Sequence, residues 1–388
     1  MQLEVSEPNQ QSKMKIQKSM DEMFHKEAED LENGGQEKSE DEEYAEHLFH
    51  KHLKFRDGRY WTKPLFKKDF KPMLNNYNLC IKRYNALRRQ LSKDPVLEKA
   101  YTEEIHKLIQ KGNVEKVDEN PLFASDPNRY LNYLPQVCVA RQDKISSKVR
   151  PVFDASSHNN QGISLSDNLY QGPKTQGSIP MITANLRVKP ILLVADLSQM
   201  FYSIGYSTEP EAHTKVDNNR DLYRFLWSDN KNDEPEVLRF KRLLMGSRCS
   251  PFQANSTIRN HLDKAIAGTD NLFVTEVCKE LKKNMYIDDI CIALKDEKET
   301  IEVRKFISDM FEGIGMKVTK FMSNSSKVLN SIPKDDLGPL MENDEPEEKE
   351  IMSANTKILG INYDPVQDSF HFSSYAKLLA DFYQTWNI

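Results

Sequence analysis

The sequence predicts an α+β fold, in which long helices are mixed with short strands paired as hairpins. Apolar residues recur at three- and four-residue steps between residues 69 and 117, and helical stretches also cover Ser250–Ala267 and Glu297–Ile314. Short β-type runs bounded by turn residues follow Asn120. Only 14 of 388 residues are glycine, and no glycine-rich phosphate loop or internal repeat occurs. These observations favour α+β over a doubly wound sheet.

The first 55 residues are predicted to form an acidic, largely disordered leader. Residues 1–49 contain 14 acidic residues and 5 lysines but few aliphatic side chains. Such a segment buries too little apolar surface to offset the entropy of ordering it. We therefore expect order to begin near Arg56.

A helical N-terminal extension is predicted over residues 56–118. Gly112 supplies a stop signal near its end. The lysines and arginines between Lys82 and Lys93 form either a solvated face or a surface that faces phosphates. Two apolar stripes define the helices: Leu74, Tyr77, Ile81, Tyr84, Leu87 and Leu91, followed by Leu97, Tyr101, Ile105 and Leu108.

The remaining chain alternates strands with helices. Gly315 follows the helical stretch that ends at Ile314, where it marks a stop. The predicted strands are Gln136–Ala140, Val149–Phe153, Ile191–Ala195, Met285–Ala293 and Ile358–Tyr363.

Charge and composition exclude several classes of protein. The net charge of −5 argues against a basic nucleic-acid binder when the chain is taken whole. Residues 1–49 account for −9 and residues 334–350 for −6, which leaves +10 on the rest. No apolar stretch approaches the roughly 18 residues of a membrane span, and no secretion signal begins the chain. Five scattered cysteines indicate neither a disulfide framework nor a zinc site, so we expect an intracellular protein.

Two strand ends carry the candidate catalytic carboxylates. Asp288 and Asp289 follow Tyr286-Ile287 between two apolar runs, a pattern that predicts the turn of a β-hairpin. Asp196 directly follows the apolar run that begins at Ile191. Two strands that bring Asp to one end of a sheet suit a two-metal phosphoryl-transfer site. The alternatives are ordinary turn chemistry for the Asp pair and a helix cap for Asp196.

Several strings, in order, resemble a retroelement reverse transcriptase. They are Ala195–Phe201, Phe225–Trp227, Gly246–Phe252 and Tyr286–Asp289. Further strings are similar to the Bel/Pao branch of long-terminal-repeat retrotransposons: Asp57–Tyr60, Val149–Ser157, Ser164–Pro173, Ser323–Ser325 and Lys357–Ile361. The similarity covers about residues 55–370, and its specificity comes from the ordered set.

The resemblance implies a right-hand polymerase fold of fingers and palm, with an antiparallel palm sheet backed by helices. It places both subdomains in residues 119–388, with an acidic loop at 334–350. The fingers would cover about 119–160 and 207–243, and the palm about 161–206 and 244–388. It also implies a polyprotein fragment truncated before a complete thumb, without RNase H or integrase. We expect weak processive synthesis from such a fragment.

The resemblance also assigns the metal site. Asp196 and Asp288 would be the principal Mg²⁺ ligands, Asp289 an auxiliary carboxylate, and the backbone carbonyl of Leu197 a further ligand. Mg²⁺ takes one or two carboxylates together with substrate phosphates, and Mn²⁺ can substitute for it. Lys320 and Lys327 are both candidates for the general acid that protonates pyrophosphate.

By the same resemblance, residues of the fingers and palm bind the incoming dNTP. Lys148 and Arg150 would grip the triphosphate, and Phe201 would exclude a ribose 2′-hydroxyl. Gly246 and Tyr286 would line the nucleotide site. From the residues alone, Lys148 and Arg150 are equally a pair of charges at a strand edge, and Phe201 equally a core residue.

Primer and template contacts are assigned to Ser250, Pro251 and Gly360. Ser250 is expected to cap the helix that Pro251 begins, and Gly360 resembles part of the strand that holds the primer end. Met245 stands where retroviral enzymes carry Gln, which puts the sugar-hydroxyl contacts at that position in doubt.

The main hypothesis is therefore an RNA-directed DNA polymerase domain that binds an RNA or DNA template with its primer and dNTP. The alternatives are a catalytically weak or inactive nucleic-acid-binding remnant and a carboxylate-dependent nuclease. Expected partners include other segments of a retroelement polyprotein, with no membrane. The expected location is cytoplasmic, in a retroelement particle, with the nucleus as the alternative.

Overall fold

The computed structural model describes residues 38–73, 75–117, 130–140, 149–210, 213–214, 216, 218–230, 233–338, 356–364 and 367–371. The fold mixes helices with small, mainly antiparallel sheets, as expected for an α+β protein. None of the helices in these ranges is long and apolar enough to cross a membrane. The N-terminal 37 residues of the predicted leader, the acidic stretch 339–350 and Leu74 of the first stripe lie outside the described residues.

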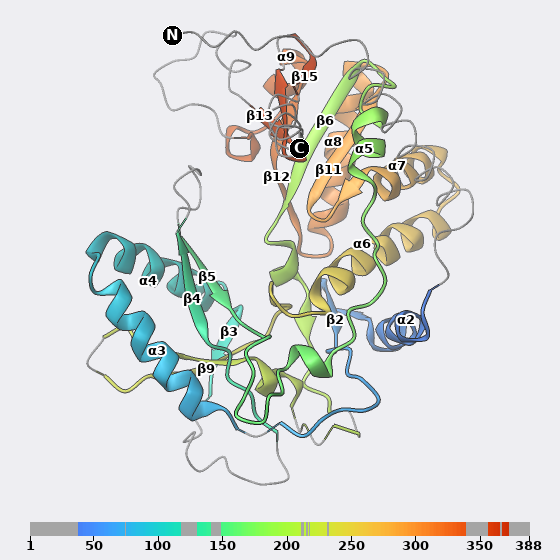
Figure 1. The fold of residues 1–388 in the computed structure, drawn as a ribbon. Helices are drawn as coiled ribbons and strands as arrows, with labels where there is room; N and C mark the ends of the chain where they lie inside the picture. The colour runs from blue at the N-terminus through green and yellow to red at the C-terminus, as the bar shows by residue number, and fades with distance from the viewer. Residues whose placement is uncertain are drawn as a thin grey trace, which may run out of the picture.

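A four-stranded antiparallel sheet of order β10-β11-β6-β12 lies at the centre of one half of the molecule (Figure 1). Helices α7 and α8 pack against one face of it, and α6 packs against α7. Strand residues that point to this face, including Leu193, Ala195 and Ile290, belong to the main hydrophobic core. The bounds are β6 Ile191–Ser198, β10 Met285–Tyr286, β11 Asp289–Leu294, β12 Lys317–Ser323, α6 Ser250–Ala267, α7 Leu272–Asn284 and α8 Glu297–Glu312.

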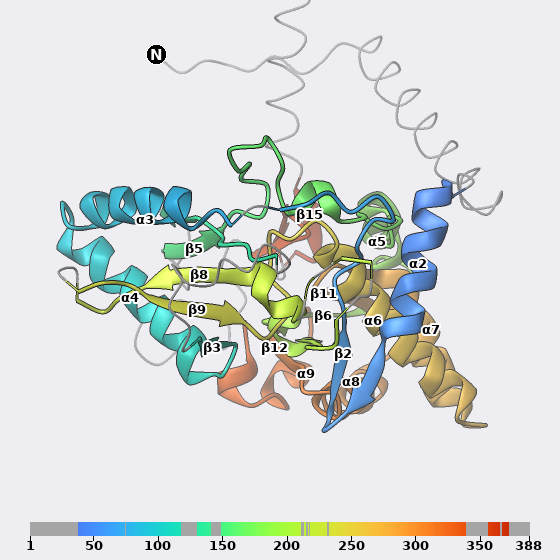
Figure 2. The same ribbon diagram turned by 90° about the horizontal axis from the view of Figure 1, so that it is seen from below.

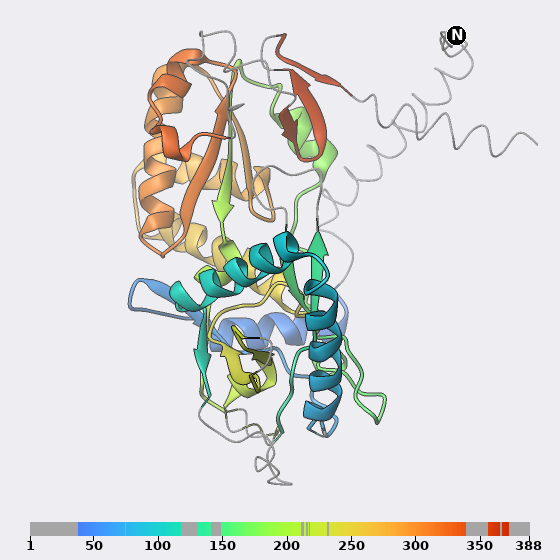
Figure 3. The same cartoon turned by 90° about the vertical axis from the view of Figure 1, so that its left-hand side faces the viewer.

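The opposite face of this sheet is covered by a short helix and a small three-stranded sheet (Figure 3). Alternate residues of β6 and β11, among them Leu192, Val194 and Cys291, pack here with Ile358 and Tyr363 in a second apolar cluster. The elements are α5 Ile179–Asn185, β13 Thr356–Ile358, β14 Ile361–Asp364 and β15 Ser369–His371, with α9 Ser326–Asn330 and the 3-10 turn η4 Lys334–Asp336 after β12.

The other half of the molecule contains two small sheets and two amphipathic helices, visible at the left of Figures 1 and 2. The helices confirm the two predicted stripes, and Gly112 follows them at a positive φ of 63°. The bounds are α3 Tyr77–Leu91, α4 Pro95–Gln110, β3 Val114–Lys116, β4 Gln136–Ala140, β5 Val149–Phe153, β8 Arg224–Trp227 and β9 Glu236–Phe240, with the 3-10 turn η3 Asn219–Tyr223.

The leader prediction is wrong for its last part, because Glu40–His52 forms the helix α2. Ser39 and Glu42 make a reciprocal capping box at its start. Ala45, Leu48 and Phe49 are buried in the main core. The acidic residues form the cap and the exposed face of this helix. A prediction based on average composition therefore misses its short apolar stripe.

A further sheet of order β1-β2-β7 follows α2. The hairpin of β1 and β2 turns at Asp57-Gly58, and β2 pairs in parallel with β7. The bounds are β1 Lys54–Arg56, β2 Arg59–Thr62 and β7 Gly205–Tyr206, and the 3-10 turns η1 Ser166–Asn168 and η2 Met200–Ser203 complete the described elements.

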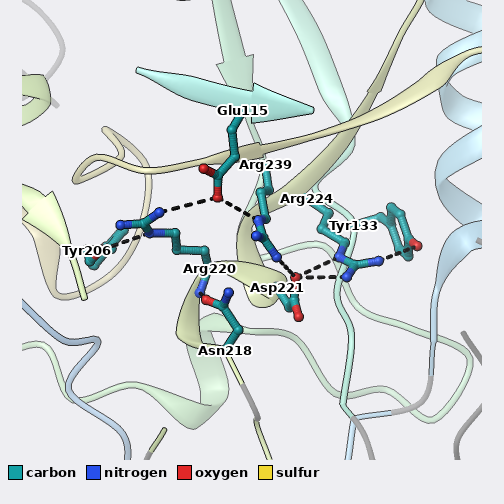
Figure 4. Close-up of polar contacts among 8 residues, drawn as sticks. All are labelled: Glu115, Tyr133, Tyr206, Asn218, Arg220, Asp221, Arg224 and Arg239. Carbon is teal, nitrogen blue, oxygen red and sulfur yellow. Dashed lines mark hydrogen bonds and ion pairs between the residues drawn. The ribbon is translucent and has the colours of Figure 1, made fainter. Parts of the chain in front are cut away.

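A partly buried ion network joins the strands of sheet β3-β9-β8 (Figure 4). Glu115, Arg239 and Arg224 are directly opposite one another across the three strands. Arg239 bridges the carboxylates of Glu115 and Asp221 at 2.8 and 2.7 Å, and Arg224 donates to Asp221 at 2.8 Å. Arg220 adds an ion pair to Glu115 at 3.3 Å. The charged side chains of this sheet are therefore neutralised by one another.

Candidate active site

Two of the candidate carboxylates are opposite each other in the central sheet. In the antiparallel pairing of β11 with β6, Asp289 is the direct partner of Asp196. Directly opposed residues point to the same face, so both leave the sheet on the side of Val194 and Cys291. The prediction that two strands bring Asp to one end of a sheet is confirmed. The helix-cap alternative is wrong, because β6 continues to Ser198.

Asp288 occupies the tip of the β10–β11 hairpin. Tyr286 pairs with Asp289, which leaves Ile287 and Asp288 as a two-residue turn. Ile287 has a φ of 56°, a left-handed conformation that is strained by ~1–2 kcal/mol for a residue with a Cβ. The backbone carbonyl of Asp288 accepts a hydrogen bond from the N–H of Leu197 at 2.8 Å. This bond ties the hairpin tip to β6 and holds Asp288 beside Asp196.

A β-bulge in β12 brings a lysine to the carboxylates. Thr319 pairs with Asp196 and Met322 with Val194, so two residues of β12 oppose one residue of β6. The first of them, Lys320, has a φ of 56°. Its Nζ lies 3.0 Å from Oδ2 of Asp196. The irregular backbone therefore turns the ammonium group toward the carboxylate.

The electrostatics of Asp288 reflect this crowding. Burial raises the pKa of Asp288, and the nearby Asp196 carboxylate raises it further. A backbone hydrogen bond, Lys320 and Arg150 act in the opposite direction on the same pKa. One like charge and two unlike charges thus act on one half-buried carboxyl. Such competition is typical of sites that exchange protons or bind cations.

Arg150 reaches the site from the other half of the molecule. It lies on β5, in the hairpin that β5 forms with β4, and it acts electrostatically on Asp288. Within the described part of the chain it has no hydrogen-bond or ion-pair partner of its own. Lys148, its predicted companion, lies outside the described residues. The structure therefore brings one of the two predicted cations of this strand toward the carboxylates.

Gly246 joins the two halves of the molecule next to the same strand. Its φ is +108°, and an added Cβ would meet the backbone oxygen of Phe153 in β5 at 3.0 Å. Glycine is thus required here both for backbone conformation and for space. Met245, just before it, exposes 55% of its surface. The backbone at Gly246 therefore lies close to β5, and its predicted place in the nucleotide site stays a prediction.

Two other predicted residues, Phe201 and Ser250, are less accessible, whereas Pro251 is exposed. Phe201 lies in η2, is 8% exposed and belongs to the main core, as the core alternative predicted. Ser250 is fully buried, with its hydroxyl 3.5 Å from that of Tyr206. The capping prediction for Ser250 is wrong, because Cys249 is the N-cap of α6 and makes no side-chain cap bond. Pro251 is in the first turn, as predicted, and is exposed.

The residues predicted for the primer end are on the same face as the carboxylates. Gly360, with a φ of 82°, and Leu359, with a φ of 52°, form the tight turn between β13 and β14. Leu359 and Tyr286 both pack against the apolar cluster that lies beside Asp196 and Asp289. The structure therefore brings the predicted primer strand to the candidate catalytic face. The carbonyl of Leu197 as a metal ligand stays a prediction.

The two lysines proposed as general acids are at opposite ends of the sheet. Lys327 pairs with Glu297 at 3.1 Å, next to the end of the sheet where Leu294 pairs with Ile191. Lys320 is at the Asp196 end. The choice between them was open from the sequence, because it depends on how β12 pairs with β6.

Comparisons with known proteins do not identify a family for this chain. No protein-family model matches the chain, and no curated protein matches it. Within the described residues there is also no group of three or more His, Cys, Asp or Glu side chains placed to hold a metal ion. The carboxylates, the cations beside them and the elements that position them are therefore the features that indicate a function.

Proposed function

We propose that this chain is an RNA-directed DNA polymerase domain with a right-hand arrangement of fingers and palm. The observation that carries the proposal is the pairing of Asp196 with Asp289 across two central strands, with Asp288 bonded through its backbone to Leu197. The ordered motifs that resemble Bel/Pao reverse transcriptases support the same function. In this proposal the palm is the sheet β10-β11-β6-β12, and the fingers include the β4–β5 hairpin.

The donor set suits magnesium. Asp196 and Asp288 provide hard oxygen donors beside each other, and Mg²⁺ completes its octahedron with substrate phosphates and water. Lys320 now neutralises one of these carboxylates, which indicates that the site favours positive charge. When bound, the metal ions would supply electrostatic stabilisation and orient an in-line displacement at the α-phosphate. Asp196 and Asp288 would hold them, with Asp289 alongside.

The surrounding residues take roles that follow from their positions. Arg150 carries positive charge from the fingers hairpin toward the carboxylates, where it would neutralise the triphosphate. Of the two candidate general acids, Lys320 would donate a proton to the pyrophosphate once its ion pair with Asp196 is released. Gly246 keeps the fingers strand close to the palm. Phe201 would exclude a 2′-hydroxyl only through the small part of its ring that is exposed.

Primer extension tests the proposal. The full chain is incubated with oligo(dT) on poly(rA), dTTP and Mg²⁺, and Asp288→Asn is compared with the wild type. We expect the variant to lose incorporation by two orders of magnitude or more, corresponding to the several kcal/mol (about 3) that such ligands supply.

The matched control is Asp309→Asn, which removes an exposed carboxylate from α8. It should leave incorporation unchanged. Equal incorporation by Asp288→Asn and the wild type would overturn the catalytic assignment. Template binding without incorporation by the wild type would favour a nucleic-acid-binding remnant.

A further inference from the structure

A second concentration of charge lies away from the carboxylates, around Trp61 of β2. Three guanidinium groups are placed over its ring, at 4.6 Å for Arg56, 5.3 Å for Arg242 and 5.9 Å for Arg220. Arg59 completes the group, which we name the Trp61 arginine cluster. The four arginines come from β1, β2, η3 and the segment after β9, so the fold gathers them from three distant parts of the sequence.

Within the part of the chain that the structure describes, most of this positive charge has no carboxylate partner. Arg220 pairs with Glu115, which Arg239 also uses. Among the described residues, Arg56 and Arg242 form no ion pair with any carboxylate. Nε and Nη1 of Arg242 are buried and have no hydrogen-bond partner. Buried donors of a charged group are costly when unpaired, so this arrangement indicates a missing acceptor.

The arginines also act on one another. Burial lowers the pKa of Arg242 to about 10, and repulsion from Arg59 and Arg220 contributes to this change. Stacking on Trp61 offsets part of the repulsion, because the face of an indole attracts cations. It does not supply hydrogen-bond acceptors for the guanidinium nitrogens. An anion that inserts among them would provide both acceptors and charge.

The cluster is fixed rigidly to the backbone of the central fold. Arg59 donates to the carbonyl of Ser203 at 2.8 Å and to that of Tyr202 at 3.3 Å, both in η2, directly after β6. Trp61 pairs with Gly205 and lies so close to it that an added Cβ would meet the ring at 2.3 Å. Preorganised groups lose little entropy when they bind a ligand.

We propose that the Trp61 arginine cluster is a phosphate-binding site. Guanidinium groups match phosphate oxygens bidentately, and phosphate offers more acceptor oxygens than a carboxylate. Three guanidinium groups and the backbone of Gly205 already crowd the indole ring, so base stacking contributes little. The ligand chemistry is therefore the phosphate group itself, either the phosphodiesters of a nucleic-acid strand or a free polyphosphate. This site does not depend on the proposed polymerase function.

The test measures binding without metal, in EDTA, so that the carboxylate site does not contribute. One arm uses a labelled single-stranded oligonucleotide with no terminal phosphates and measures its affinity by fluorescence anisotropy at several salt concentrations. The other arm uses inorganic tripolyphosphate and measures thermal stabilisation. The variants are Arg242→Gln and Arg56→Gln; Arg56 is exposed, so its replacement should not affect folding.

We expect each substitution to weaken oligonucleotide binding roughly tenfold and to reduce the salt slope by about one. Lys305→Gln, which removes one exposed charge from α8, should change neither quantity. If only the tripolyphosphate effect is lost, the site binds free polyphosphate. If both variants bind both probes as the wild type does, the cluster is a structural feature and the proposal fails.

Discussion

Two rows of directly opposed residues, each containing charged side chains, cross two different sheets of this molecule, and their charges are arranged in opposite ways. In sheet β3-β9-β8 the row is Glu115, Arg239 and Arg224, with Asp221 inserted between the two arginines. In the central sheet the row is Asp289, Asp196 and Thr319. Opposite charges alternate around the first row, whereas the second places two carboxylates side by side, which is unfavourable.

The rows also differ in how their charges are neutralised. Asp221 and Arg224 are 1% and 0% exposed and satisfy each other inside the protein. Asp196 is 21% exposed, and its ion-pair partner Lys320 is 51% exposed and held by a strained bulge. In the first row, here called the closed row, the charged side chains pair with one another, and this pairing stabilises the fold. In the second row, here called the open row, Asp196 is neutralised by an exposed lysine, so this cation can be exchanged for another.

The closed row should show the largest effect on stability. Asp221→Asn leaves Arg224 buried without its counter-charge, and removing one partner of a buried pair costs about 3–5 kcal/mol. Urea unfolding of the variant and the wild type measures this loss. A loss below about 1 kcal/mol is typical of an exposed surface ion pair and would contradict the contrast between the two rows.

The matched control replaces both partners, with Asp221→Leu and Arg224→Met in one chain. Apolar residues of similar volume remove the buried charges together, so most of the lost stability should return. A double variant as unstable as Asp221→Asn would show that packing, rather than charge, maintains this region.

The open row should respond to magnesium. A ligand that binds only the folded protein stabilises it by roughly 1.4 kcal/mol when present at ten times its dissociation constant. We expect Mg²⁺ to raise the midpoint of thermal unfolding of the wild type but not of Asp196→Asn. Asp309→Asn should respond like the wild type. Equal stabilisation of Asp196→Asn would show that Mg²⁺ binds elsewhere.

The carboxylates of the open row could be predicted from the sequence, whereas the ion network of the closed row could not. The apolar run from Ile191 and the Tyr286–Asp289 string placed Asp196, Asp288 and Asp289 together from the sequence, because strands and hairpin turns leave strong local patterns. The amphipathic helices α3 and α4 were predicted for the same reason. Helix α2 was missed, because three buried residues were hidden in an acidic segment.

The features that could not be predicted depend on distant or irregular contacts. The bulge that aims Lys320 at Asp196 arises from the register of β12 against β6, which no local pattern specifies. The Asp221 network requires three strands from separate parts of the chain. The burial of Ser250 follows from its contact with Tyr206, not from its position at a helix start.

The bulge itself offers a smaller, sharper test. Lys320→Met and Lys320→Gly both remove the ammonium group, but only glycine adopts a φ of 56° without strain. We expect the glycine variant to be the more stable by roughly 0.5–1 kcal/mol in urea unfolding, after the greater entropy of its unfolded chain is included. At Lys305, inside helix α8, the same two substitutions should rank in the reverse order. The same order at both positions would argue against strain at Lys320.

The pH dependence of Asp288, the chain neighbour of Asp289 in the open row, gives the last test. Its pKa in the folded protein is raised, first by burial and then by Asp196, so the folded state binds this proton more tightly than the unfolded chain does. The free energy of unfolding must therefore fall as the pH rises from the ordinary value near 3.9 through the raised pKa.

Above the raised pKa the full cost of the charge is present, and acidification through this window relieves it. Asp288→Asn removes the titration, so the stability of the wild type relative to this variant should increase as the pH is lowered through the same window, by at most about 1.4 kcal/mol for each unit of pKa change. Urea unfolding at a series of pH values measures the difference, with Asp309→Asn as the reference. A difference that grows in the opposite direction would mean that Lys320 and Arg150 outweigh burial and Asp196, and the second row would then be closed like the first.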